Sequence, residues 1–114
     1  MEYQDILFEI KEGYAVLTFN KPDKLNALGS RMKEELEDAI KAVDADDKIR
    51  GLIITGAGRG FMAGTDLSEL DTSRTGAETK EMSLHGQALM NQLEALGKPV
   101  IAAVNGYALG GGTE

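Results

Sequence analysis

The chain has 114 residues, of which 42% are hydrophobic and 27% charged, so it can bury an apolar core and form one small domain or part of a larger one. Twelve basic and nineteen acidic side chains give a formal net charge of −7, which argues against nucleic acid or an anionic membrane surface as a partner. The absence of cysteine excludes a disulfide framework, a cysteine-ligated metal site and a thiol nucleophile within this sequence.

The first residues show no targeting signal. Residues 1–5 (MEYQD) contain neither a basic stretch nor an apolar one, and the first arginine is Arg31. The longest apolar run, residues 100–104, is far shorter than the roughly 20 residues that a membrane helix needs. We therefore expect a cytoplasmic protein with no membrane as a partner.

A hairpin and a helix are predicted in the first part of the chain. Residues 6–11 alternate in hydrophobicity, residues 14–19 form a second apolar stretch, and the short glycine-containing turn between them is typical of a hairpin. Apolar residues then recur at helical spacing over residues 32–43, with Ser30 as the predicted N-cap. We expect the acidic residues of this helix to form a solvated face: Glu34, Glu35, Glu37 and Asp38.

A buried strand and a glycine-rich segment follow. The continuously apolar run at residues 52–55 is typical of a strand covered on both faces. Glycines are dense over residues 56–64, and residues 66–70 are predicted to form a short helical turn. Asp66 and Glu69 fit the first turn of that helix, where acidic side chains suit the helix dipole.

The last part of the chain is predicted to contain a loop, a helix and a strand. Residues 71–76 are polar, and we expect them to form a mobile loop. Apolar residues over 82–96 predict a second long helix, which ends at the Gly-Lys-Pro of residues 97–99, and residues 100–104 predict another buried strand. The alternation of strands and helices indicates an α/β fold with a parallel sheet and right-handed crossovers.

Glycine is enriched: 14 of the 114 residues, about 12%, are glycine, compared with roughly 7% in an average protein. Glycines cluster after both apolar strands, at residues 56–64 and 110–112. Ligands favour the carboxyl ends of strands in such sheets, and glycine lets backbone N–H groups come close to them. Two such loops could aim two N–H groups at one oxygen, as in an oxyanion hole. Two tight turns without a ligand fit the same spacing.

A dinucleotide site is the alternative use of these glycines. Residues 58–63 (GRGFMA) match the pattern G-x-G-x-x-A after a predicted strand. In that fingerprint a long helix follows directly, whereas Gly64 interrupts this position. A phosphate-binding G-x-x-x-x-G-K motif does not occur in the sequence. The pattern therefore gives little support to a nicotinamide cofactor.

Three blocks resemble the enoyl-CoA hydratase/isomerase (crotonase) superfamily. They are residues 20–28 (NKPDKLNAL), 61–67 (FMAGTDL) and 98–114 (KPVIAAVNGYALGGGTE), in the order and at the spacing of that family. The resemblance implies an α/β crotonase-like fold, a spiral of ββα turns. It also implies that residues 1–114 are the amino-terminal part of a single crotonase-fold domain whose carboxy-terminal part is missing, because members of the family are longer chains.

The resemblance also implies catalytic roles. The backbone N–H groups of Thr65 and Gly111 match the pair that polarises the thioester carbonyl, although the family usually has Ala at the first position. Glu114 matches the first of two catalytic glutamates in the hydratases, and the second lies further along the family's chain. Hydration needs such a pair because a hydroxyl and a proton are added across one double bond.

Coenzyme A is implied as part of the substrate, with no permanently bound cofactor and no metal. Residues 24–27 resemble the stretch that lies against the adenine and phosphates, with Lys24 as a phosphate contact. Ser68 stands where members often have a second basic residue, which removes one such contact. The implied binding residues are Lys24, Leu25, Ala27, Ala63, Thr65, Asp66, Leu67 and Ser68.

The function implied is therefore chemistry on an acyl-CoA thioester through an enolate stabilised by an oxyanion hole, with hydration of a 2-enoyl-CoA as the first expectation. An enoyl-CoA isomerase, which can use one carboxylate to move a proton, is the alternative within the fold. A truncated, non-catalytic CoA-binding or assembly module is the alternative of another class. The family also implies a homotrimer or hexamer, and the single histidine, His85, is expected to be a structural helix residue.

Overall fold

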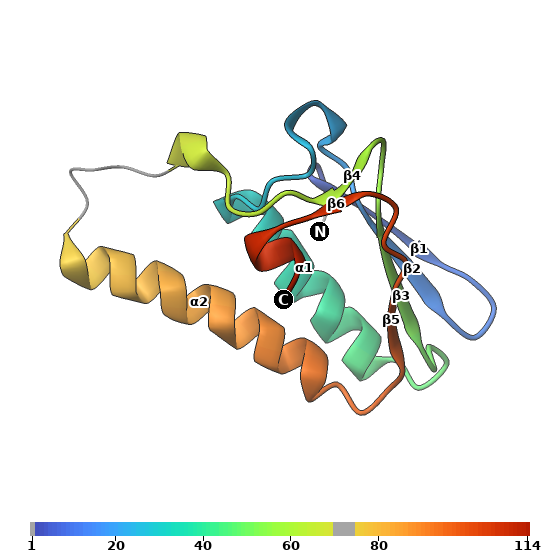
Figure 1. Ribbon diagram of the computed structural model, residues 1–114. Helices are drawn as coiled ribbons and strands as arrows, with labels where there is room; N and C mark the ends of the chain where they lie inside the picture. The colour runs from blue at the N-terminus through green and yellow to red at the C-terminus, as the bar shows by residue number, and fades with distance from the viewer. Residues whose placement is uncertain (1, 70–74) are drawn as a thin grey trace.

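The computed structural model describes residues 2–69 and 75–114. A four-stranded sheet forms one layer, α1 lies against it, and α2 packs alongside α1 (Figure 1). Two further short strands pair with each other beside the carboxyl ends of β3 and β5 (Figure 1). The large sheet contains β1 (Ile6–Ile10), β2 (Ala15–Phe19), β3 (Leu52–Gly56) and β5 (Val100–Ala102); the small one contains β4 (Gly60–Met62) and β6 (Tyr107–Ala108). The helices are α1 (Ser30–Ala45) and α2 (Gly76–Glu94), and the short 3-10 turns are η1 (Pro22–Lys24), η2 (Leu67–Glu69) and η3 (Gly110–Gly112).

The large sheet has the order β1-β2-β3-β5. β1 and β2 form an antiparallel hairpin, whereas β2 pairs with β3, and β3 with β5, in parallel. The chain passes through α1 between β2 and β3, and through α2 on its way to β5. This arrangement confirms the predicted hairpin followed by a parallel α/β sheet. It also makes β3 and β5 neighbours, so that the two glycine-rich segments leave the sheet at the same edge.

The core lies between one face of the sheet and α1. Alternate residues of the strands point to this face, and the apolar stripe of α1 packs against them. Two aromatic rings close one end of the core, where Phe19 of β2 meets Phe61 of β4 edge to face at a centroid distance of 5.5 Å. The largest fully buried apolar side chains are Ile6, Leu17, Met32, Leu36, Val43, Ile49, Leu52 and Leu89.

Two predictions for α1 are wrong in detail. Its N-cap is Gly29, and Ser30 is the first helical residue, so the predicted cap is displaced by one position. Glu35 is not on a solvated face, since only 3% of it is exposed. Its carboxylate accepts backbone hydrogen bonds from Gln4 at 2.8 Å and Asp5 at 2.9 Å, because the segment before β1 has no strand partner there.

The two apolar strands are less covered than their sequences predict. In β3 only Leu52 and Ile54 are buried, because the helices lie on one face of the sheet. β5 ends at Ala102 and is an edge strand of the described sheet, with Ile101 59% and Val104 58% exposed. The prediction of a buried strand over residues 100–104 is therefore wrong for this structure.

The remaining elements agree with the predictions in kind and differ in length. α2 begins at Gly76, earlier than its apolar residues indicate, and ends before the Gly-Lys-Pro of residues 97–99. The predicted helical turn over residues 66–70 is the shorter η2, and its last predicted residue, Leu70, is outside the described part of the chain. The polar loop predicted over residues 71–76 also lies largely outside the described residues.

Candidate functional site

Thr65 lies in a loop that is paired with the segment leading into α1. The N–H of Leu28 donates to Gly64 O at 2.6 Å, and the N–H of Asp66 donates to Leu28 O at 2.9 Å. These two bonds flank Thr65 and form an isolated parallel bridge. Within residues 2–69 and 75–114, the N–H of Thr65 itself donates to no protein acceptor. Thr65 thus has a backbone donor available on a loop that is fixed on both sides.

Gly111 lies in η3, directly after β6. The hydrogen bonds of this turn start at Gly112, whose N–H donates to Leu109 O at 2.9 Å, so the N–H of Gly111 precedes the first of them. The turn lies against the Thr65 loop, because a Cβ built on Gly110 would be 3.7 Å from the Cα of Gly64. The structure therefore brings the two predicted donor loops together.

Close approach of the backbone explains part of the glycine enrichment. A Cβ on Gly112 would lie 1.9 Å from Met62 O, and one on Gly106 would lie 1.8 Å from Arg59 O. No side chain fits at either position, so β4 and the segment that contains β6 and η3 can lie side by side only with glycine there. These two glycines serve backbone packing, which the spacing of the sequence could not distinguish from a role at a ligand.

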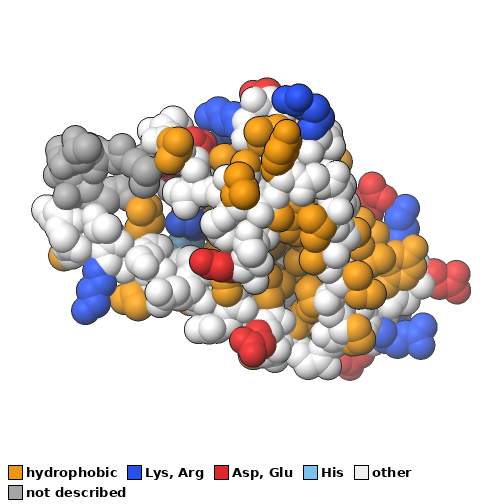
Figure 2. Space-filling view, viewed as in Figure 1, with side chains coloured by type: hydrophobic (Ala, Val, Ile, Leu, Met, Phe, Trp, Pro, Cys, Tyr) orange, Lys and Arg blue, Asp and Glu red, His pale blue; other side chains and the backbone are white. Residues whose placement is uncertain are grey.

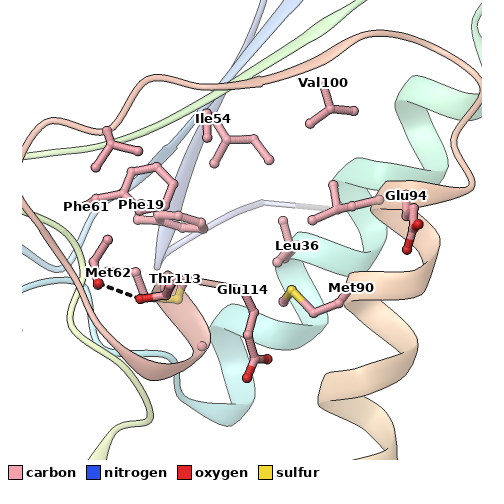
Figure 3. A pocket seen from close by; sticks show the side chains of 16 residues that line it. Phe19, Leu36, Ile54, Phe61, Met62, Met90, Glu94, Val100, Thr113 and Glu114 are labelled. Carbon is pink, nitrogen blue, oxygen red and sulfur yellow. Dashed lines mark hydrogen bonds between the residues drawn. The ribbon is translucent and has the colours of Figure 1, made fainter.

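An apolar cavity of about 590 Å³ opens beside η3, and Gly111 and Glu114 both line it. Figure 3 shows the rings of Phe19 and Phe61 on one side, with the carboxylates of Glu94 and Glu114 turned away from them. In Figure 2 hydrophobic side chains surround a hollow on this face of the molecule. The predicted glutamate therefore lies next to a predicted N–H donor, at the rim of an apolar space.

A second, polar hollow of about 500 Å³ lies at the start of α1. It gathers four of the predicted CoA-binding residues, Lys24, Ala27, Asp66 and Ser68. The other four predicted residues, Leu25, Ala63, Thr65 and Leu67, are outside its lining, and Leu67 is 75% exposed. The further residues around this hollow are Asp5, Lys21, Gly29, Ser30, Arg31 and Glu69.

Ion pairs balance the charges of this polar hollow. Lys24 Nζ lies 3.4 Å from Asp66 Oδ2, and the lysine side chain is 44% exposed. Hydrogen bonds from the Ser68 hydroxyl and backbone N–H, with Lys24 as a weaker influence, hold the pKa of the Asp66 carboxyl below its usual value. Asp66 is buried, whereas the partly exposed Lys24 ammonium stays accessible to an anion from solvent.

Comparison with known proteins places the chain in a family. The family model described as enoyl-CoA hydratase/isomerase matches residues 9–114. The chain belongs to the enoyl-CoA hydratase/isomerase family. The relatives include a crotonyl-CoA hydratase of Syntrophomonas wolfei, 44% identical over 100% of this chain and 44% of the relative. They also include a 1,2-epoxyphenylacetyl-CoA isomerase of Escherichia coli, 44% identical over 94% of this chain and 42% of that protein.

The fold agrees with this family. An enoyl-CoA hydratase/isomerase from Xanthobacter autotrophicus Py2 superposes with a TM-score of 0.92 at 32% sequence identity. The match covers 97% of this chain and 42% of that one. The crotonase-like α/β fold predicted from the sequence blocks is thereby confirmed. The chain spans less than half the length of the relatives it matches.

Two asparagines that sequence reasoning left out organise the loops of this family member. Asn26 is fully buried, accepts from Lys21 N at 2.8 Å and donates to Ala57 O and Gly60 O at 3.0 and 2.8 Å. Asn105 donates to the same Gly60 O at 3.2 Å and accepts from Gly56 N at 3.0 Å. Both asparagines lie inside the blocks that resemble the family, and this position was the one sign in the sequence that they matter. Most of their hydrogen-bond partners are distant in the sequence.

The backbone at Leu25 and Asn26 is unusual. Both residues have positive φ, 51° and 58°, in the left-handed region that a leucine seldom adopts. The side-chain amide of Asn26 holds this conformation, because its oxygen accepts from Lys21 N and its nitrogen donates to Gly60 O. In the same conformation Ala63 N donates to Leu25 O at 3.1 Å. Strain of this kind persists where the surroundings over-determine the backbone, and it occurs at binding sites. The hydrogen bond between Ala63 and Leu25 therefore joins the predicted CoA-binding segment to the loop that carries Thr65.

His85 bonds Glu37 at 3.2 Å between α2 and α1, as expected of a structural helix residue. In the described part of the chain, no group of three or more His, Cys, Asp or Glu side chains is arranged to hold a metal ion. No described helix is long and apolar enough to cross a membrane.

Proposed function

We propose that the protein acts on acyl-CoA thioesters and adds water to a 2-enoyl-CoA. The observation that supports this most is the contact of the Thr65 loop with the Gly111 turn, because that turn and Glu114 line an apolar cavity. The Thr65 N–H has no acceptor among the described residues, and the Gly111 N–H at the start of η3 belongs to the turn that touches its loop; two such donors suit an oxygen that gains negative charge. The relatives named as hydratases agree with the proposal.

The reaction assigns a task to each group. Addition of water to the β-carbon moves charge onto the thioester oxygen, and the N–H groups of Thr65 and Gly111 would stabilise this enolate. Glu114 would take a proton from the attacking water as a general base. The side chain of Thr65 narrows the space but leaves the backbone donor intact. The α-carbon then takes a proton from an acid, which the family supplies with a second glutamate.

Coenzyme A would enter as part of the substrate. Lys24 lines the polar hollow with Ala27, Asp66 and Ser68 and would contact a phosphate there. Leu25, Ala63 and Leu67, which lie outside its lining, would contact other parts of the coenzyme. Ser68 is neutral and its hydroxyl donates to Asp66, so this position lacks the basic side chain that members of the family often have. The homotrimer or hexamer and the cytoplasmic location stay predictions of the family resemblance.

An isomerase is the second candidate. A relative of equal identity is named as a 1,2-epoxyphenylacetyl-CoA isomerase. Of the two carboxylates that line the apolar cavity, Glu94 comes from α2, and Glu114 follows η3, the turn that contains Gly111. A single carboxylate can take a proton from one carbon and return it to another. The two candidates share the stabilised enolate and differ in the fate of the proton.

Substitution of Glu114 tests the proposal in the natural protein. Glu114→Gln should lower hydration of crotonyl-CoA about 10²–10⁴-fold, because a general base is lost, while binding of the thioester changes little. Hydration is measured by the loss of absorbance of the conjugated thioester, and binding by calorimetry. The matched control is Glu94→Gln, since Glu94 lines the same cavity from α2.

The pair of variants decides between the carboxylates. Full turnover in Glu114→Gln, or a loss in Glu94→Gln instead, would contradict the assignment. If the wild-type protein shifts the double bond of a 3-enoyl-CoA and adds no water, the isomerase replaces the hydratase.

A further inference from the structure

The N-terminus of α1 is capped by a residue from elsewhere in the chain. The N-cap, Gly29, has no side chain with which to bond the first N–H groups. The carboxylate of Glu69 takes this place, accepting from Ser30 N at 3.1 and 3.0 Å and from Ser30 Oγ at 2.5 Å. Glu69 lies 39 positions further along the sequence. A negative carboxylate there also suits the dipole of α1.

Gly29 is needed for this arrangement. A Cβ on Gly29 would lie 2.1 Å from Glu69 Oε2, so any side chain at the N-cap would displace the carboxylate. At most helix starts serine or aspartate caps at least as well as glycine. Here the space of the capping side chain is filled by Glu69. The Glu69 carboxylate can therefore occupy its position only because residue 29 has no side chain.

Glu69 also fixes the segment that carries Thr65. This segment, residues 64–69, is attached at both ends. At its start the Leu28 N–H donates to Gly64 O and the Asp66 N–H donates to Leu28 O, and at its end the Glu69 carboxylate accepts from Ser30 N. Both attachments are made to residues 28–30, which form the start of α1 and the two positions before it. Between them lies η2, which has no buried residue. Apolar packing therefore does not hold this turn, and polar contacts have to.

We propose that Glu69 is a positioning residue for the reaction: by capping α1 it holds the Thr65 N–H in place toward the thioester oxygen. This inference rests on the proposed function in naming the thioester as the group that Thr65 meets. The anchoring itself concerns only contacts within the chain. Misplacement of an oxyanion donor by about 1 Å can cost on the order of 10²-fold in rate. Loss of the anchor should therefore affect chemistry more than folding.

The decisive variant is Gly29→Ser in the natural protein. Its hydroxyl gives α1 an ordinary cap, and its Cβ displaces Glu69, so that the helix stays capped while the Thr65 segment loses its anchor. We expect unchanged stability in urea and a kcat lowered about 10- to 100-fold. The infrared C=O stretch of a bound ¹³C-labelled crotonyl-CoA should move back toward its value in water, since carbonyl polarisation falls.

Substitutions of Glu69 provide the matched pair. Glu69→Gln keeps an amide oxygen that accepts from Ser30 N, and should retain the carbonyl shift and kcat within about threefold. Glu69→Ala has no acceptor and should resemble Gly29→Ser in both readouts. A purely structural role predicts the opposite pattern, with the loss of kcat following the loss of stability and Gly29→Ser behaving as wild type.

Amide hydrogen exchange separates this inference from the proposed function. Without the anchor, exchange of the Asp66 N–H, which donates to Leu28 O, should accelerate at least about tenfold in both Gly29→Ser and Glu69→Ala. This holds whether or not the protein binds a thioester. Unchanged exchange in Glu69→Ala would overturn the anchoring. Faster exchange with an unchanged carbonyl frequency and kcat would overturn the role in positioning. If Gly29→Ser does not fold, the contrast between Glu69→Ala and Glu69→Gln decides.

Discussion

The two helices are held in place by opposite means. α1 has seven buried residues, and its own charges oppose its dipole, with Arg31 and Lys33 in the first turn and Asp44 in the last. Charged residues from other segments compensate for this unfavourable arrangement. The Glu69 carboxylate accepts from Ser30 at the start of α1, and Lys98 Nζ donates to the carbonyls of Val43 and Asp46 at its end. α2 is longer but buries only Leu89, and its cap, Thr75, is local and accepts from Glu78 N at 3.1 Å.

The contrast shows how one helix can depend on the fold while another depends on its own sequence. α1 has neither an acid in its first turn nor a base in its last, so its caps exist only when η2 and the segment after α2 are in place. α2 has its cap in its own sequence but little apolar contact with the core. Stability should therefore be sensitive to changes in α1 and tolerant of changes in α2.

The largest effect is expected from the core face of α1. Leu36 is 1% exposed, and Leu36→Ala should lower the free energy of unfolding by about 2–5 kcal/mol, because transfer energy is lost and a cavity is left. Urea unfolding measures it. The control is Leu84→Ala on α2, where Leu84 is 52% exposed and the change should stay within about 0.5 kcal/mol. Equal effects of the two would contradict the comparison.

An intermediate effect is expected at the helix ends. Lys98→Met should lower the free energy of unfolding by about 1–2 kcal/mol, because the last carbonyls of α1 lose a charged donor. Thr75→Ala removes the local cap of α2, and it should increase amide exchange only in the first turn of that helix. Urea unfolding and hydrogen exchange distinguish the two. A global loss of protection in Thr75→Ala would show that α2 supports the core more than its burial indicates.

The smallest effect is expected where the helices meet. A hydrogen bond from His85, then one from Lys41, lowers the pKa of Glu37 below its ordinary 4.5. Because the folded-state pKa is depressed, the stabilisation is present above that ordinary value and is lost as the pH falls through the folded-state value. The stability difference between wild type and Glu37→Gln should thus be about 0.3–1 kcal/mol at neutral pH and vanish in acid. A difference that grows as the pH falls would reverse the sign.

Local pattern predicted most of the large sheet and both helices. The alternation of β1 and the helical spacing of α1 are properties of neighbouring residues, so the sequence alone suffices for them. β4 and β6 have three and two residues, and they exist because Gly106 and Gly112 let two backbones meet. No periodicity can indicate strands of that length.

In the candidate site, too, some features could be predicted from the sequence, whereas those that depend on distant contacts could not. Thr65, Gly111 and Glu114 were predicted from resembling blocks, and the structure brings the loops of the first two together. Glu69 was predicted to suit its own short helix, yet its carboxylate bonds the start of α1. The burial of Glu35 and Asn26 was missed for the same reason, since their partners come from other segments. Polar contacts over such separations have no local signature.

The parallel pairing of the sheet implies an order of assembly. The β1–β2 hairpin joins neighbouring residues and can form within microseconds, whereas β3 can pair with β2 only after the chain through α1 has closed into a loop. β5 must in turn wait for the chain through α2. Contacts of this separation slow folding. The loops that follow β3 and β5, which include Thr65 and Gly111, should therefore be the last part of the molecule to gain a fixed shape.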